Sequence, residues 1–271
     1  AAVEEGPVII MDRERRRELA VQVPEPVESL LILDEEPLDL LVGTVGAHLY
    51  RIDAPTASAT RVESFDTLSC RSEWHTPWGG PPAVRSMADG GKGWLYADIH
   101  VGSIMRSPDA GGSWEPVTPE LNEDVHQVNT SPAAPERIYA NTARAVYISD
   151  DRGDSWTHRA DDLDERYGRA IAAHPQDPDL ALASVSDGPH GDNVHAGLYR
   201  TEDAGRNWTH ITEGFPASLP ENINTFRVAF TADGLAWAAA GRSLHVGVGR
   251  ARRWQEWWQA PEKIIMVSRR P

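Results

Sequence analysis

The sequence predicts an all-β protein assembled from repeated sheets of four short strands. Three observations support this class. An eight-residue motif with Asp, Gly and Trp at fixed positions occurs three times in the chain. The interval between its copies matches the length of a four-stranded repeat. The 271 residues include 22 glycines, 20 prolines and 10 tryptophans, a composition typical of many short strands joined by turns.

The repeated motif is Ser/Thr-x-Asp-x-Gly-x-x-Trp. Its copies occupy residues 107–114, 149–156 and 201–208, and their aspartates are Asp109, Asp151 and Asp203. Each copy follows a short apolar run and precedes a polar, strand-like segment, so each is expected to form a hairpin loop. The Asp can accept hydrogen bonds from N–H groups of its own loop, and the Gly supplies the positive φ of a tight reversal. The Trp ring can then pack in an apolar seam beside the hairpin.

This motif resembles the Asp-box, or BNR repeat, of sialidase-like and sortilin-like β-propellers and of photosystem II assembly factors. The resemblance covers residues 80–260 once the flanking strands are included. It implies a β-propeller of four-stranded blades in which the boxes are structural elements on the outer edge. It leaves the activity open, because one fold carries many functions.

Five full repeats can be followed along the chain. They are expected over residues 29–65, 84–117, 125–158, 169–211 and 226–258. The first has lost the box, and residues 247–254 of the last stand where a box has decayed. The box aspartates are 42 and then 52 residues apart, which is the size of one blade.

The two ends of the chain are expected to complete the ring. Residues 7–11 and 19–23 read as strands, and residues 263–267 form an apolar segment after a complete repeat. Joining them in one composite blade would remove the open sheet edges. Six blades in a single domain over residues 1–271 is the favoured count, with five or seven as alternatives and a frayed tail as the alternative for the ends. Helices are hardly supported; residues 13–19 and 161–166 could each form a turn.

Charge and cysteine content narrow the function classes. The formal net charge is −15, with 41 acidic and 26 basic residues, which argues against a nucleic-acid partner held through phosphates. Cys70 is the single cysteine, so no intrachain disulfide is expected, and we interpret it as a small apolar filler.

No apolar run approaches the ~20 residues of a membrane helix. No signal peptide is visible, so a cytoplasmic location is expected unless a leader has been removed.

Basic and imidazole side chains recur at equivalent repeat positions. The innermost strands begin near Arg85, His126, Arg169 and Arg227. The turns after the second strands add His100, Arg144, His190, His195 and Arg242. The long connection 66–83 adds Trp74, His75 and Trp78, and residues 186–195 form a second long connection. Long loops often carry function. All of these side chains are therefore expected at the mouth of the central channel, in a bowl walled by indole rings.

Converging guanidiniums would bind a small anionic molecule or acidic sugar. The residues expected to act in catalysis are His100, His126, Arg169 and His190. Those expected to bind substrate are Trp74, His75, Arg85, Arg144, His195, Arg227 and Arg242. A transition metal ion is a candidate cofactor, with His75, His100, His126, His190 and His195 as its candidate ligands, although no spacing is a metal signature. Asp98, Asp187 and Asp192 could orient a histidine or complete a metal shell.

Two function classes follow. The first is a hydrolase or lyase that uses the bowl on a small anionic substrate, and it is slightly favoured. The second is a non-catalytic module that docks a partner protein, as in the assembly-factor branch of the resemblance. An enzyme should bury His75, His100 and His190 in one pocket, whereas a scaffold should leave them exposed. Sialidase activity is disfavoured, because no Arg-Ile-Pro segment occurs near the N-terminus and no Glu is expected at the channel mouth to activate Tyr167.

Overall fold

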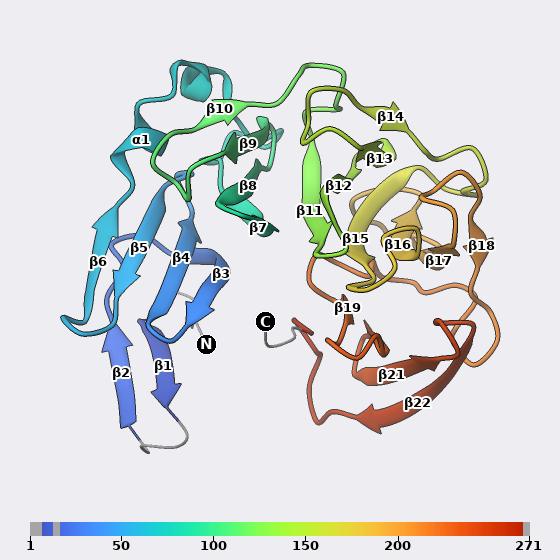
Figure 1. The fold of residues 1–271 in the computed structure, drawn as a ribbon. Coiled ribbons are helices and arrows are strands. Elements are labelled where there is room, and N and C mark those ends of the chain that lie inside the picture. Colours follow the sequence, from blue (N-terminus) through green and yellow to red (C-terminus); the bar gives the residue numbers. More distant parts are fainter. Residues whose placement is uncertain (1–6, 13–16, 268–271) are drawn as a thin grey trace. The chain divides into compact units, whose positions relative to one another are not determined.

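The computed structural model describes residues 7–12 and 17–267, and it is almost entirely β (Figure 1). It contains six sheets, of which five are four-stranded and antiparallel and one is a two-stranded hairpin. The number of sheets equals the number of expected blades. The chain divides into two compact units between Pro116 and Val117. In the part of the chain that is described, no helix has the length and apolarity needed to cross a bilayer.

Unit 1 holds the hairpin and two blades. The hairpin is β1 (Val8–Asp12) and β2 (Arg17–Val21). The first blade is β3 (Val27–Glu35), β4 (Leu38–Thr44), β5 (Leu49–Asp53) and β6 (Ser58–Arg61). The second blade is β7 (Val84–Gly91), β8 (Trp94–Ile99), β9 (Ser103–Ser107) and β10 (Glu115–Pro116). Helices α1 (Glu63–Asp66) and η1 (Ser69–Glu73) lie between these blades in sequence.

Unit 2 holds three blades. The third blade is β11 (Val125–Ser131), β12 (Ala134–Thr142), β13 (Ala145–Ser149) and β14 (Thr157–His158). The fourth is β15 (Tyr167–Ala173), β16 (Ala181–Ser186), β17 (Gly197–Thr201) and β18 (Thr209–His210). The fifth is β19 (Val228–Phe230), β20 (Ala236–Ala240), β21 (Ser243–Val248) and β22 (Arg253–Gln259). The five predicted repeats are thereby confirmed.

The apolar core lies between successive sheets. One cluster joins Val146 and Ile148 of the third blade to Ile171 and Tyr199 of the fourth. A second cluster joins the fourth blade to the fifth around Trp254. Every residue of β16 is buried. A strand covered on both faces reads as a continuous run of small and apolar residues, as Ala-Leu-Ala-Ser-Val-Ser does here.

The Asp-boxes have the predicted structural role. Asp151 Oδ1 accepts from the Ser155 amide at 2.8 Å, and its Oδ2 accepts from the Ser155 hydroxyl at 2.6 Å. The Ser149 hydroxyl also donates to Asp151 and receives the Gly153 amide at 2.7 Å. Gly153 has a φ of 90°, and a Cβ there would stand 2.7 Å from Val117 Cγ1. The turn therefore requires glycine for both conformation and packing.

The other two boxes repeat this pattern. Asp109 accepts from the Ser113 amide at 2.7 Å, and Asp203 accepts from the Asn207 amide at 2.9 Å. For Asp109 these hydrogen bonds lower the pKa directly. Burial by itself would raise the pKa of Asp203, but hydrogen bonds from Asn207 outweigh it and lower the pKa below its ordinary value. Each carboxylate is thus held ionised by its own loop.

The last blade replaces its box with an ion-pair network. Glu202, inside the box of the fourth blade, accepts from Arg250 Nε at 2.9 Å and from Arg252 Nη2 at 2.7 Å, and it also pairs with Arg200. Arg250 pairs in turn with Asp177. Burial by itself would raise the pKa of Glu202, but hydrogen bonds from Arg252, Arg200 and Arg250 outweigh it and lower the pKa to about 2. The network links the turn of the fifth blade to the fourth blade.

Each end of the described chain is paired within its own unit. β1 pairs with β2, and the described residues 263–267 contain no strand. The Ile264 amide donates to the Gly241 carbonyl at 2.9 Å, and the Val267 amide donates to the Phe226 carbonyl at 2.6 Å. These hydrogen bonds attach the C-terminal segment to the fifth blade. A sheet shared by the two ends stays a prediction, because it would join the two units.

The short helices also differ from expectation. Residues 161–166 form turns. The helix α1 ends where the long connection 66–83 begins, and η1 lies inside that connection. Phe65 of α1 is fully buried and packs against Trp74 and Trp114. Side-chain packing, rather than helix propensity, therefore decides where these turns form. Of the expected turn at residues 13–19, residues 13–16 lie outside the described part, and β2 begins at Arg17.

Candidate functional site

The innermost strands share a β-bulge at one position. The register shifts between Val84 and Ser86, between Val125 and Gln127, and between Gly168 and Ile171. Arg85 and His126 are the single residues at their bulges, and Arg169 shares its bulge with Ala170, so the three lie at corresponding points of their strands. A bulge leaves one residue unpaired and redirects its side chain, and bulges are frequent beside functional sites.

Two residues, Glu28 and Arg227, change the set of residues expected at this strand position. The first blade has the same bulge between Val27 and Ser29, so Glu28 belongs to the set. The prediction missed Glu28, although Val27-Glu28-Ser29 repeats the Val84-Arg85-Ser86 pattern in the sequence. Arg227 is offset by one, because it directly precedes the first paired residue, Val228. The Arg227 carbonyl accepts the Ala239 amide at 2.8 Å, so Arg227 continues the strand pairing, and Phe226 before it has a φ of 63°.

The starts of the three inner strands of unit 2 lie side by side. Gln127 Oε1 accepts the amides of Ile171 and Phe226, each at 3.2 Å. The Thr225 hydroxyl donates to the His126 carbonyl at 2.7 Å. The structure therefore brings the segments of His126, Arg169 and Arg227 together, as predicted.

His126 is fully buried and orients its neighbours. Its Nδ1 lies 2.6 Å from the Gly168 carbonyl, so Nδ1 must carry the proton. Its Nε2 lies 3.2 Å from the Tyr167 hydroxyl and 3.1 Å from Asp124 Oδ1. Nε2 can accept from Tyr167 when the ring is neutral and can donate to Asp124 when it is protonated. These contacts are those of a positioning residue, and the catalytic role expected of His126 stays a prediction.

Arg169 and Arg227 approach the base of the long connection 186–195. Arg169 Nη2 lies 3.5 Å from the Pro189 carbonyl, and the guanidinium is 4.9 Å from the centre of the Tyr167 ring. Arg227 Nη1 donates to the Asn222 carbonyl at 3.3 Å. The Asn222 side chain donates to the carbonyls of Gly188 and Pro189 at 3.0 and 3.1 Å. One fixed junction therefore holds both guanidiniums, and we call Arg169, Arg227 and Asn222 the arginine site.

Arg227 is the unusual member of the arginine site. Only 5% of its surface is exposed. Its Nε has no hydrogen-bond partner, and within residues 7–12 and 17–267 no carboxylate lies within 4.0 Å of its guanidinium. Burial lowers its pKa, and the more distant Glu221 opposes this only partly. A buried cation without a partner is costly, because the protein returns little of the lost hydration energy.

Two carboxyl groups and a histidine meet at the ends of the same connection. His195 Nδ1 lies 2.6 Å from Asp187 Oδ2, and both side chains are exposed. The hydrogen bond with His195 lowers the pKa of Asp187. Burial, followed by a hydrogen bond with Asp187, raises the pKa of Glu165. Of these two carboxyl groups, Glu165 therefore favours its acid form and Asp187 favours its ionised form.

The predicted residues of unit 1 divide between core and surface. Trp74 is 7% exposed and packs on Phe65 and Arg71, so its placement at an open rim was wrong. Aromatic burial in the core outweighs its position in a long loop. His75 is exposed. Trp78 has 69% of its surface exposed, and the centre of its ring lies 4.8 Å from the centre of the His100 ring. Arg85 is half-buried at its bulge.

The remaining predicted residues lie on turns. His190 and Arg144 are exposed. Arg242 Nε donates to the Ala260 carbonyl at 2.9 Å, which fastens the chain after β22. Two of the candidate metal ligands of unit 2 are already engaged, His126 with Gly168 and His195 with Asp187. A metal ion at the histidines stays a prediction.

Comparisons with known proteins agree with this architecture. The family model described as Sortilin, neurotensin receptor 3, matches residues 102–218. A curated relative from Neosartorya fischeri, named a probable oligoxyloglucan-reducing end-specific xyloglucanase, is 27% identical over 171 residues. That match covers 56% of this chain and 19% of the relative.

Solved structures show the same fold at low identity. An ancestral GH74 enzyme matches 95% of this chain and 36% of its own length, with a TM-score of 0.71 and 16% identity. The structure titled "YCF48 bound to D1 peptide" matches 94% of this chain and 71% of its own length, with a TM-score of 0.58 and 15% identity. These matches show the β-propeller fold, and the three boxes have the hydrogen-bonding pattern predicted from the sequence.

Proposed function

We propose that this chain is a binding propeller that recognises a carboxylate of a partner chain at the arginine site. The observation that carries the proposal is the buried guanidinium of Arg227, whose Nε has no hydrogen-bond partner and which pairs with no carboxylate of the described residues. The protein has 41 acidic residues against 26 basic ones, so carboxylates for pairing are abundant. Because the Arg227 guanidinium pairs with no carboxylate of the described residues, it stays available for an external anion.

The geometry suits a carboxylate. A guanidinium offers two parallel N–H donors to the two oxygens, and such bonds strengthen where water is excluded. Asn222 is 9% exposed and hydrogen-bonded on both sides, since the Ser186 hydroxyl donates to its Oδ1 at 2.6 Å. The junction is therefore ordered before a ligand arrives, which lowers the entropic cost of binding.

The exposure of the histidines favours binding over catalysis. An enzyme was expected to bury His75, His100 and His190 in one pocket, whereas His75 and His190 are exposed. The fold neighbour whose title names a bound D1 peptide supports the same class. At 15% identity that likeness supports the fold, and the peptide-binding role of this chain rests on Arg227.

Acid–base hydrolysis is the second candidate, favoured by Glu165, Asp187 and His195. Their carboxyl pKa values are displaced in opposite directions, as acid and base partners require. The name of the curated relative points to glycoside hydrolysis. That chemistry needs carboxyl groups at least about 5 Å apart, whereas Glu165 and Asp187 share a hydrogen bond. The spacing therefore ranks this candidate below binding.

The test compares Arg227→Met with the parent protein. The probe is a mixture of N-acetylated peptides with free C-terminal carboxylates, measured against the same peptides as C-terminal amides. We expect binding of the free acids, at least about tenfold weaker binding of the amides, and a similar loss in the variant, which corresponds to about 1.4 kcal/mol. Arg144→Met, which changes an exposed turn arginine, is the matched control.

Two results would count against the proposal. Equal binding of acids and amides would show that the carboxylate is not recognised. Cleavage of an aryl glycoside that is lost in both Asp187→Asn and Glu165→Gln, but kept in Arg227→Met, would favour the hydrolase instead.

A further inference from the structure

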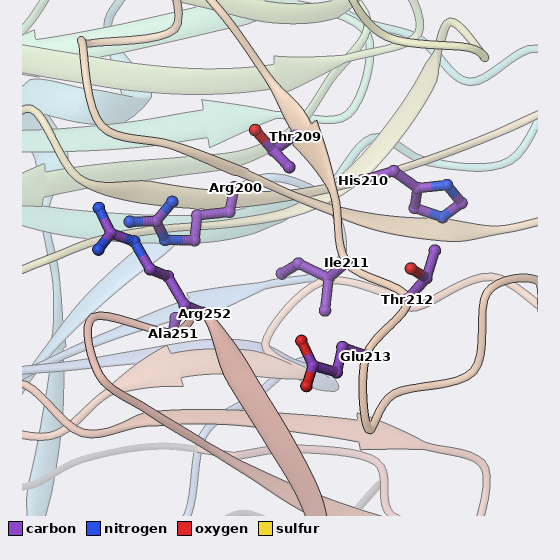
Figure 2. Close-up of a pocket in the computed structure, with 8 residues that line it drawn as sticks. All are labelled: Arg200, Thr209, His210, Ile211, Thr212, Glu213, Ala251 and Arg252. Atoms are coloured by element: carbon purple, nitrogen blue, oxygen red, sulfur yellow. The ribbon is translucent and has the colours of Figure 1, made fainter.

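A cavity lies in unit 2, at the outer edge between the fourth and fifth blades. Its volume is about 210 Å³. Its lining comes from β17, β18, the segment after β18 and the turn before β22 (Figure 2). The lining residues are Arg200, Thr209, His210, Ile211, Thr212, Glu213, Ala251 and Arg252. None of them belongs to the arginine site.

One wall of this cavity carries two arginines that share the single carboxylate of Glu202, which is not part of the lining, so the wall keeps a net positive charge. Arg200 is 6% exposed, and its Nε donates to the Arg250 carbonyl at 2.5 Å, so its position is fixed. Arg252 gives only Nη2 to Glu202, at 2.9 and 2.7 Å from the two oxygens. Its Nε and Nη1 have no partner in the described chain. Figure 2 shows the two guanidiniums side by side.

The opposite wall is anionic. Glu213 is exposed, and no basic group of the described residues lies within 4.0 Å of its carboxylate. Its backbone is fixed, because its carbonyl accepts the Trp254 amide at 3.3 Å. A Cβ at the following Gly214 would stand 1.7 Å from the Trp254 carbonyl oxygen, so the two chains are in close contact there.

Apolar groups separate the two walls. Figure 2 shows the Ile211 side chain between the guanidiniums and the Glu213 carboxylate, and Ala251 beside the base of the Arg252 side chain. The His210 ring points away from them, and it stacks on Tyr199 with centres 4.6 Å apart. The cavity therefore presents a positive end, an aliphatic middle and a negative end.

We propose that this cavity binds a small zwitterion of the α-amino-acid class. The ligand carboxylate would take the free donors of Arg252 beside Arg200, and its ammonium group would pair with Glu213. A short side chain would rest on Ile211 and Ala251. A volume of about 210 Å³ holds about seven waters at about 30 Å³ each, which matches a small amino acid.

The two charged walls set the specificity. A simple anion meets Glu213, and a simple cation meets the two arginines, so each lacks one favourable contact and gains one repulsive contact. A zwitterion satisfies both ends.

The experiment is calorimetric titration of the whole chain with L-alanine, acetate and ethylamine, each to about 10 mM, where a dissociation constant near 1 mM approaches saturation. We expect L-alanine to bind at least tenfold more tightly than either single-charge probe. Glu213→Gln and Arg252→Gln should each weaken L-alanine binding by at least tenfold. Arg227→Met, at the arginine site, should leave it unchanged, so the two sites fail or succeed separately.

Three results would overturn the proposal. They are acetate binding as tight as L-alanine binding, no heat from L-alanine at the highest concentration, or full binding by Glu213→Gln. Both substituted side chains are exposed, so their variants are expected to fold. A thermal melt of each variant gives an independent check of folding, and a Glu213→Asp variant that regains binding would confirm the need for the negative wall.

Discussion

The Glu202 network provides a stability test that follows directly from the decayed box. In Glu202→Gln the side chain keeps its size but loses the charge that Arg200, Arg250 and Arg252 share. The turn of the fifth blade has no box aspartate to hold it, because Gly249 stands at that position. We therefore expect the substitution to loosen the junction between the fourth and fifth blades.

The magnitude follows from the pKa of Glu202. A carboxyl whose pKa falls from an ordinary 4.5 to about 2 on folding would gain about 3 kcal/mol at neutral pH. The Glu202 side chain is 31% exposed, so solvent screening reduces this contribution to about 1–2 kcal/mol. Because the pKa is lowered in the folded state, the contribution is complete above pH 4.5 and is lost as the pH falls towards 2.

Urea unfolding at several pH values measures this contribution. We expect the parent protein to exceed Glu202→Gln by about 1–2 kcal/mol at pH 7 and by nearly nothing at pH 2. Glu115→Gln is the matched control, since Glu115 is 56% exposed and pairs with Arg106 alone; its expected cost is below about 1 kcal/mol. A difference that persists unchanged at pH 2 would show that shape, not charge, explains the effect.

Three further predictions concern single residues. Asp151→Ala removes the acceptor of the Ser155 amide and should cost about 1–2 kcal/mol in urea unfolding while peptide binding at the arginine site is kept; a binding defect at unchanged stability would contradict its structural role. Gly168→Ala would place a Cβ 1.7 Å from Asn141 Oδ1 and should cost about 3 kcal/mol, whereas Gly188→Ala, with no atom within 4 Å, should be nearly silent. Arg227→Met should raise the melting temperature of the ligand-free protein, because it removes a buried charge that no carboxylate compensates. A lower melting temperature would show that the arginine stabilises the fold.

The repeat structure could be read from the sequence because each repeat contains its own local signals. In each box Asp, Gly and Trp act within a few residues of each other, so the hairpins of Asp109, Asp151 and Asp203 were predictable. The bulged Arg85, His126 and Arg169 were found through the same alignment. Arg227 was placed one position off, since the positive φ of Phe226 leaves no mark in a sequence that has Phe where Gly or Asn would be expected.

The features that were missed depend on contacts between distant residues. Trp74 occupies a loop of polar and proline-rich composition, and only its contact with Phe65 shows that it belongs to the core. His126 reads as a channel histidine until the Gly168 carbonyl and Tyr167 hydroxyl are seen beside it. The Glu202 network joins a carboxylate to arginines 48 and 50 positions away, a pairing that a chain of 24 arginines leaves undetermined.

The most direct test of the binding proposal observes Arg227 itself. In a ¹⁵N-labelled sample, the Nε–H resonance of Arg227, assigned by its loss in Arg227→Met, is followed while an N-acetylated peptide with a free C-terminal carboxylate is added. We predict a saturable downfield proton shift, because the unpartnered Nε–H gains a charged acceptor, and no shift with the peptide amide. A resonance that stays in place while the free acid binds elsewhere on the protein would contradict the arginine site as the point of recognition.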